Sequence, residues 1–179
     1  PIPRLTRRSL LRHATLTGIA LPLVGSSVLV RAAANDKLRL AGIGVGGMGG
    51  ADLASLSSHP HVEVVALCDV DSGNLSAAGE KHPGAKRFRD FRKMFDDFAG
   101  SIDAVHVSTP DHTHAPAAMT AMNHGKHVYC QKPLTHDVHE ARQLRAIAAA
   151  NPALVTQMGT QIHSNTQYRT RSEEHTSEL

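Results

Sequence analysis

The strongest constraint on the fold is a glycine-rich turn at residues 44–49, which reads GVGGMG. It follows a short apolar run at 38–43, typical of a buried strand, and it opens a helical pattern at 47–58. Glycines at this spacing allow a tight turn after the strand and a close approach of the following helix. The motif therefore predicts a strand–turn–helix unit of an α/β protein.

Strand and helix patterns continue to alternate after this unit. Further strands are predicted at 62–68, 102–108, 126–130 and 154–158, with a weaker candidate at 85–89. Further helices are predicted at 72–81, 91–98, 115–124 and 135–149, the last with Thr135 as its N-terminal cap. This rhythm predicts a doubly wound parallel sheet with helices on both faces, for which 3-2-1-4-5-6 is the common strand order.

An acidic residue, Asp69, ends the second predicted strand, twenty residues after Gly49. In a Rossmann-type fold, Gly44 permits the turn, Gly46 lets the backbone approach a pyrophosphate, and the helix N-terminus holds the phosphates. The acid then accepts hydrogen bonds from the adenosine ribose. Two other interpretations stay open at this point. Asp69 could cap the next helix, and methyltransferases also combine a glycine loop with an acid.

The charge of Asp69 bears on which dinucleotide would bind. A carboxylate repels the 2′-phosphate of NADP, and residues 69–72 contain no arginine that would offset this repulsion. We therefore expect NAD rather than NADP as the cofactor.

Charge is distributed unevenly along the 179 residues. Residues 1–34 hold five arginines and no acid, so the remaining 145 residues carry a net charge of −2 although the whole chain carries +3. A nucleic-acid-binding face needs clustered basic residues, usually with aromatics, and aromatic residues make up only 3% of this chain. We therefore expect one compact domain with no nucleic-acid partner.

The N-terminal segment has the pattern of an export signal. A basic stretch with TRRSLL at 6–11 precedes an apolar run at 15–30, and small residues at 31–34 suit cleavage after position 34. The paired arginines resemble the twin-arginine signal, so we expect export of the folded protein to the periplasm by the twin-arginine machinery. The alternatives are a membrane anchor, for which the run is short, and a basic helix.

The C-terminal residues 171–179 read RSEEHTSEL and show no apolar periodicity. They resemble a translated sequencing adapter, so we expect a non-native tail. The alternative is a solvated polar tail.

Two cysteines, Cys68 and Cys130, end the second and fifth predicted strands. In the predicted order these strands are three positions apart, roughly 14 Å at the usual strand spacing. A disulfide spans at most ~7 Å between Cα atoms, so we expect two free thiols in the core.

Two later segments lie where the fourth and fifth predicted strands end. One reads STPDHTH at 108–114, and the other reads GKHVYCQKP at 125–133. Both belong at the carboxyl edge of the sheet near its topological switch point, where ligands bind in such folds. Together with the glycine turn and Asp69, these segments resemble, over residues 37–170, the glucose-fructose oxidoreductase / inositol dehydrogenase / rhizopine catabolism (Gfo/Idh/MocA) family.

The resemblance implies roles for the matching positions. Thr109 and Pro110 would line the nicotinamide and pyrophosphate channel, and His114 would approach the nicotinamide end. Lys132 would touch the substrate and the nicotinamide ribose, where a cation stabilises the negative charge that alcohol oxidation builds on oxygen. Without the motif, Lys132 would be interpreted as a solvated lysine. Gln131 replaces the family's common glutamate, which puts the electrostatic setting of Lys132 and a hydrogen bond to the cofactor in doubt.

The candidate catalytic residue is therefore Lys132. The candidate cofactor contacts are Gly44, Gly46, Gly47, Met48, Gly49, Asp69, Thr109, Pro110, His114, Gln131 and Lys132. The 13 histidines raise the question of a metal site, with the nearest set at His112, His114, His136 and His139. No zinc-type spacing is present and the resemblance already accounts for one of them, so we expect no metal.

The resemblance also implies a domain organisation. The expected parts are an export signal at 1–34, a NAD(P)-binding domain at 35–158, the start of a substrate domain at 159–170 and the tail at 171–179. The family's C-terminal α/β domain, which carries the acid/base histidine, would be missing. We therefore expect residues 35–170 alone to bind NAD weakly and to show no dehydrogenase turnover.

For the full-length protein, the resemblance implies an exported, homo-oligomeric oxidoreductase that acts on a sugar or polyol by hydride transfer. Two alternatives stay open. One is an NAD-dependent glycoside hydrolase of the same family, and the other is a non-catalytic nucleotide-binding protein.

Overall fold

The computed structural model describes residues 37–164. Its strands are β1 (Leu38–Ile43), β2 (Val62–Cys68), β3 (Lys86–Phe88), β4 (Ala104–Val107), β5 (His127–Gln131) and β6 (Thr156–Gly159). Its α-helices are α2 (Gly47–Ser57), α3 (Ser72–Lys81), α4 (Phe91–Phe98), α5 (His114–Asn123) and α6 (Val138–Ala150). Short 3₁₀ turns are η1 (Ala99–Ser101), η2 (Asp111–Thr113) and η3 (Gln161–Ser164).

The expected export signal at 1–34 and the expected tail at 171–179 lie outside the described residues. Within the described part of the chain, no helix combines the length and the apolar character needed to cross a membrane.

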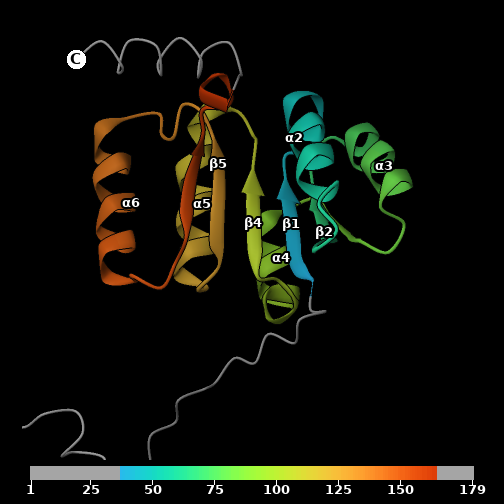
Figure 1. Cartoon of the computed structure of the whole chain (residues 1–179), viewed down its shortest axis with the longest axis horizontal. Coiled ribbons are helices and arrows are strands. Elements are labelled where there is room, and N and C mark those ends of the chain that lie inside the picture. The colour runs from blue at the N-terminus through green and yellow to red at the C-terminus, as the bar shows by residue number, and fades with distance from the viewer. Residues whose placement is uncertain (1–36, 165–179) are drawn as a thin grey trace, which may run out of the picture. The chain divides into compact units, whose positions relative to one another are not determined.

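All six strands form one parallel sheet in the order β3-β2-β1-β4-β5-β6 (Figure 1). This confirms the predicted doubly wound order, including the weak candidate at 85–89, which forms the edge strand β3. The chain builds outward from β1 to β3 and then returns to place β4 on the other side of β1. The carboxyl ends of β1 and β4 therefore border the topological switch point.

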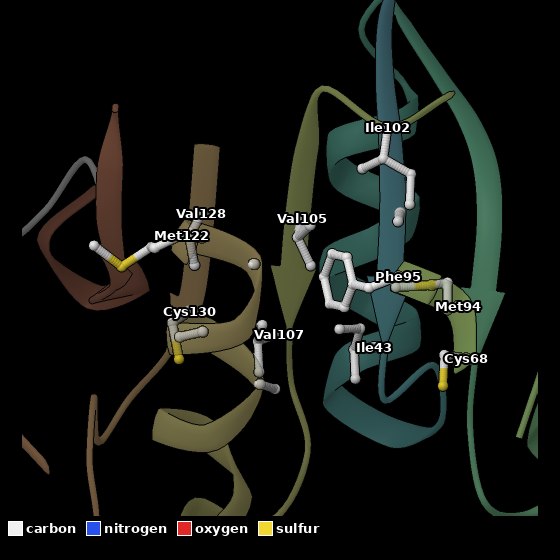
Figure 2. Packing of buried hydrophobic residues seen from close by; sticks show 14 of the residues in the cluster. Ile43, Cys68, Met94, Phe95, Ile102, Val105, Val107, Met122, Val128 and Cys130 are labelled. Carbon is white, nitrogen blue, oxygen red and sulfur yellow. The ribbon is translucent and has the colours of Figure 1, made fainter. Parts of the chain in front are cut away.

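Helices cover the two faces of the sheet over separate cores. α4, α5 and α6 pack on one face and enclose the first core. α2 and α3 pack over β1 and β2 on the other face and enclose the second core. Alternation along β1 sends Ala41 and Ile43 into the first core and Leu40 into the second. Figure 2 labels large buried side chains of the first core: Ile43, Cys68, Met94, Phe95, Ile102, Val105, Val107, Met122, Val128 and Cys130.

On the face of the sheet opposite the first core, β4 and β5 carry polar side chains. His106 alternates with valines that enter the first core, and Tyr129 and Gln131 alternate with Val128 and Cys130. The rings of His106 and Tyr129 lie next to each other, 5.8 Å apart between centroids. This polar strip lies beside α2, where Gln131 contacts Asp52.

Helix α6 begins later than predicted, and Thr135 is not its cap. The Asp137 side chain accepts a hydrogen bond from the Glu140 N–H at 2.9 Å, and the Asp137 backbone is extended, as an N-terminal cap requires. The Thr135 hydroxyl instead donates to the Asp137 carbonyl oxygen at 3.0 Å. Glu140 also accepts a hydrogen bond from the His136 N–H, which satisfies a further backbone donor at the start of the helix.

The cysteines agree with the expectation of two buried free thiols. Burial raises the pKa of Cys130 to about 12. Burial, together with the negative charges of Asp90 and Asp69, raises the pKa of Cys68 to about 12. At pH 8, only roughly one thiol in ten thousand is then the reactive thiolate.

We therefore expect the native chain to be almost inert to a disulfide reagent such as dithionitrobenzoate at pH 8. The same chain unfolded in guanidinium chloride should release two equivalents of thionitrobenzoate within the mixing time. Rapid reaction of either thiol in the native chain would contradict the burial of Cys68 and Cys130.

Candidate functional site

The glycine turn lies between β1 and α2 and is held against the ends of two neighbouring strands. The Gly44 N–H donates to the Cys68 carbonyl oxygen at 2.8 Å, and the Gly44 backbone has a φ of +78°. A Cβ at this position would lie 2.6 Å from the Ser108 carbonyl oxygen. Position 44 therefore requires glycine both for its backbone conformation and for the close approach of the end of β4.

Gly49 packs the first turn of α2 onto the same glycine turn. A Cβ on Gly49 would collide with the Gly44 carbonyl oxygen and would lie 3.0 Å from the Ser108 Cβ. The helix can therefore approach the sheet this closely only with hydrogen at position 49.

The N-terminus of α2 is open to a ligand. Gly46 is its cap residue, so no side chain accepts a hydrogen bond there, and the first turn, which contains Gly47 and Met48, has no acid. Met48 is 62% exposed. Gly46 lies against the Asn74 side chain of α3, and a Cβ there would collide with its amide. N–H groups and a helix dipole presented in this way favour an anionic group such as a phosphate.

Asp69 lies directly after β2, beside the glycine turn. Its Oδ2 accepts a hydrogen bond from the Val45 N–H at 2.9 Å, and its Oδ1 accepts one from the Asp71 N–H at 2.9 Å. The cap of α3 is Asp71, whose side chain accepts the Asn74 N–H at 2.9 Å. The helix-cap interpretation of Asp69 is therefore wrong. The carboxylate of Asp69 keeps lone pairs for further donors.

A cleft of about 810 Å³ opens at the carboxyl edge of the sheet, across the switch point. We call it the switch-point cleft. Its volume falls within the ~300–1,000 Å³ typical of small-molecule sites. Its lining brings together five of the predicted cofactor contacts, which are Gly44, Gly46, Asp69, Thr109 and Pro110.

The Thr109 hydroxyl is buried, and none of the described residues forms a hydrogen bond with it. A buried hydroxyl without a partner costs free energy, which a ligand that bonds to it would recover. The adjacent glycine turn carries no side chain at positions 44 and 46, and a Cβ on Gly44 would lie 2.8 Å from the Thr109 nitrogen. These two observations show that the residues present fit a phosphate-bearing dinucleotide.

His114 joins the segment after β4 to the segment after β5. Its ring is 2% exposed, with Nδ1 2.6 Å from the Pro133 carbonyl oxygen and Nε2 2.7 Å from the Thr109 carbonyl oxygen. The ring therefore fixes the spacing of the Thr-Pro and Lys-Pro segments. Its predicted approach to the nicotinamide end remains a prediction, and the neighbouring residues His112 and Thr113 are the ones that line the switch-point cleft.

Lys132 and Gln131 differ sharply in burial at the end of β5. The Lys132 side chain is exposed, and the Lys132–Pro133 peptide bond is cis. Gln131 is buried, its Oε1 accepts the Lys132 N–H at 2.7 Å, and its Nε2 donates to Asp52 Oδ2 at 2.7 Å. The position that lacks a carboxylate therefore contacts one from α2.

Residues 38–158 match the family described as "Oxidoreductase family, NAD-binding Rossmann fold" (GFO_IDH_MocA). The chain belongs to this family. The resemblance of its motifs to the Gfo/Idh/MocA proteins is thereby confirmed, together with the NAD(P)-binding Rossmann fold of the described domain.

Three relatives illustrate the similarity. The scyllo-inositol 2-dehydrogenase (NADP(+)) IolU of Bacillus subtilis is 35% identical over 99 residues, which cover 54% of this chain and 30% of that protein. A glycosyl hydrolase family 109 protein of Solibacter usitatus is 30% identical over 154 residues, which cover 78% of this chain and 35% of that protein. The crystal structure of myo-inositol 2-dehydrogenase from Lactobacillus plantarum superposes with a TM-score of 0.72 at 28% identity, over 77% of this chain and 40% of that one. The chain thus spans about a third of the length of these curated relatives.

Two functional candidates in this Gfo/Idh/MocA domain were missed from the sequence. Arg89, directly after β3, lines the switch-point cleft, and its Nη2 donates to the Val70 carbonyl oxygen at 2.8 Å. It lies 20 residues beyond Asp69, outside the segment 69–72 whose lack of an arginine favours NAD. Asp52 lies on α2, and its helical spacing from Gly49 and Leu53, which face the sheet, was the available signal in the sequence.

The described residues contain no group of three or more His, Cys, Asp or Glu side chains placed to hold a metal ion. Within the histidine set considered above, His112 lies beside Asp111, 3.8 Å between Nδ1 and Oδ1, and both side chains are exposed. His114 has both ring nitrogens engaged with backbone carbonyl groups.

Proposed function

We propose that this chain is the dinucleotide-binding part of an exported oxidoreductase that acts on a sugar, polyol or related CH–OH substrate by hydride transfer. The observation that carries the proposal is the switch-point cleft, in which the glycine turn, Asp69 and the unpartnered Thr109 hydroxyl meet. The names of the inositol dehydrogenase relatives support the substrate class.

The nicotinamide ring, when bound, would accept the hydride. The chain's own residues would bind and orient the cofactor: the N-terminus of α2 the pyrophosphate, Asp69 the adenosine ribose, and Thr109 with Pro110 the path to the nicotinamide. The exposed Lys132 would stabilise the negative charge that develops on the substrate oxygen. The acid/base histidine would come from the second domain of the full-length protein.

We propose NAD as the preferred dinucleotide, with NADP as the weaker ligand. The Asp69 carboxylate is held in place by two backbone N–H groups and would repel a 2′-phosphate. Arg89 works in the opposite direction, because its guanidinium group is next to Val70 and faces the same cleft. The relative named for NADP(+) shows that family members can use the phosphorylated cofactor.

A titration of the chain with NAD and NADP by calorimetry tests the proposal. Thr109→Val should weaken NAD binding about 2–10-fold, since one net hydrogen bond is worth ~0.5–1.5 kcal/mol. It should leave the unfolding free energy unchanged or slightly higher, because the hydroxyl has no hydrogen-bond partner among residues 37–164. An unmodified chain that fails to bind either dinucleotide would refute the proposed function. Equal NAD affinity of Thr109→Val and the wild type would show that the Thr109 hydroxyl does not bind the cofactor.

An NAD-dependent glycoside hydrolase is the second candidate. The glycosyl hydrolase family 109 relative, which matches 78% of this chain, favours it. Release of an aryl alcohol from an aryl glycoside by the full-length protein, without net NADH, would support hydrolysis. Reduction of NAD by a free polyol would support the oxidoreductase, and the absence of both would support a non-catalytic nucleotide-binding protein.

Export by the twin-arginine machinery to the periplasm and a homo-oligomeric full-length protein are further proposals. The basic and apolar pattern of residues 1–34 supports the first, and the family resemblance supports the second. Fusion of residues 1–34 to a reporter that functions only after folded export would test the first, and light scattering on the full-length protein would test the second.

A further inference from the structure

A polar cluster lies behind Lys132, on the second face of β4 and β5. Asp52 of α2 is 9% exposed, and its Oδ2 accepts a hydrogen bond from Gln131 Nε2 at 2.7 Å. Its Oδ1 accepts one from Gln161 Nε2 at 3.2 Å, and His106 Nε2 lies 3.5 Å from Oδ2. We call Asp52, His106, Gln131 and Gln161 the Asp52 cluster.

The cluster places a carboxylate among amide donors with little cationic compensation. The neighbouring basic side chain His106 places its Nε2 3.5 Å from Asp52 Oδ2. Burial lowers the pKa of His106, and the negative charge of the neighbouring Asp52 offsets only part of this shift. The neutral ring is therefore favoured. Neither ring nitrogen of His106 makes a hydrogen bond with the described residues. The two glutamine amides therefore hold the Asp52 carboxylate.

The hydrogen bonds of the cluster have a defined direction. An ionised carboxylate only accepts, so the Gln131 NH₂ group must face Asp52. The Gln131 carbonyl oxygen must then face the other way, where it accepts the Lys132 N–H at 2.7 Å. A change of acceptor at position 52 would remove the reason for this orientation. The charge on α2 thus determines which Gln131 atom meets the backbone of Lys132.

We propose that Asp52 is a positioning residue for Lys132, acting through the Gln131 amide, so that α2 and the Lys-Pro segment form one rigid unit. This inference rests on the proposed function only in assigning the Lys132 side chain to ligand contact. The effects of substitutions at positions 52 and 131 should therefore depend on each other. A carboxylate at 131 facing Asp52 would be repelled, whereas a carboxylate at 131 facing an amide at 52 would restore the same hydrogen bonds in reverse.

The test compares Asp52→Asn, Gln131→Glu and the double variant in the 179-residue chain. The signature is the Lys132 backbone amide in ¹H–¹⁵N spectra, with its hydrogen-exchange protection as the second readout. Gln131→Glu should lower the protection of the Lys132 N–H at least tenfold, because two carboxylates then face each other. Asp52→Asn keeps one acceptor oxygen and should lower it less, and the double variant should restore it to within about threefold. Asp96→Asn, at an exposed position on α4, is the matched control and should change nothing.

Losses that add in the double variant, or full protection in Gln131→Glu, would overturn the proposal. If a single variant does not fold, a pH titration of the wild-type chain tests the proposal instead. The ¹³C carboxyl shift of Asp52, the Gln131 side-chain amide and the Lys132 amide should change with one midpoint. His106 of β4, Tyr129 of β5 and His163 of η3 are titratable groups around Asp52, and their own shifts identify their contributions.

Failure of the inference and failure of the proposed function are distinguishable. The Lys132 amide signature does not need a bound dinucleotide, whereas the NAD titration does not need the cluster. If the double variant restores the protection of the Lys132 amide but the chain binds no NAD, the role of Asp52 stands and the proposed function is refuted.

Discussion

Replacing Gly49 with alanine is expected to lower NAD affinity at least tenfold and to lower the unfolding free energy by about 1–3 kcal/mol. The added methyl group would collide with the Gly44 carbonyl oxygen and lie 3.0 Å from the Ser108 Cβ. The first of these atoms is backbone, so α2 must move away from the glycine turn rather than repack a side chain. That movement displaces the N–H groups proposed to hold the phosphates. Calorimetry with NAD and denaturant unfolding measure the two effects.

Gly84→Ala is the matched control for this change. A Cβ at Gly84 meets nothing within 4 Å, and its φ lies outside the left-handed region. The control should bind NAD like wild type and should be as stable or slightly more stable, because alanine restricts the unfolded chain. Wild-type affinity in Gly49→Ala would show that the close approach of α2 is not needed for binding.

The fold was predictable because its signals are local. The strand order followed from the alternation of patterns, and β2, nearly all apolar, behaves as a strand buried between helices. The start of α6 was less predictable because Thr135 and Asp137 are both good cap residues and lie two positions apart. Which of them becomes the cap depends on where the backbone leaves the extended region, and tertiary contacts decide that.

The site was predictable where its residues follow strands directly and unpredictable where it depends on long-range contacts. Asp69 and Thr109 meet because parallel strands end at one edge of the sheet. Gln131 looked from the sequence like the loss of a carboxylate next to Lys132. The structure places the Asp52 carboxylate 2.7 Å from its amide, 79 positions away in the chain, where no local pattern links the two residues.

The second large effect is expected at Lys132 in the full-length protein. Lys132→Met keeps the length of the side chain and removes its charge, so turnover with a polyol substrate should fall about 10²–10³-fold. NAD affinity should change by less than about threefold, because the exposed lysine is proposed to act on the substrate oxygen rather than on the phosphates. Steady-state kinetics and an NAD titration separate the two quantities.

Lys93→Met supplies the control, since Lys93 is an exposed lysine on α4. It should match wild type in turnover, NAD affinity and stability. A turnover loss in Lys132→Met that is matched by an equal loss of NAD affinity would place the lysine on the cofactor instead of the substrate. Turnover within threefold of wild type would remove it from the chemistry altogether. A fall in turnover alone would place the charge at the reacting oxygen, where the hydride leaves and the negative charge builds.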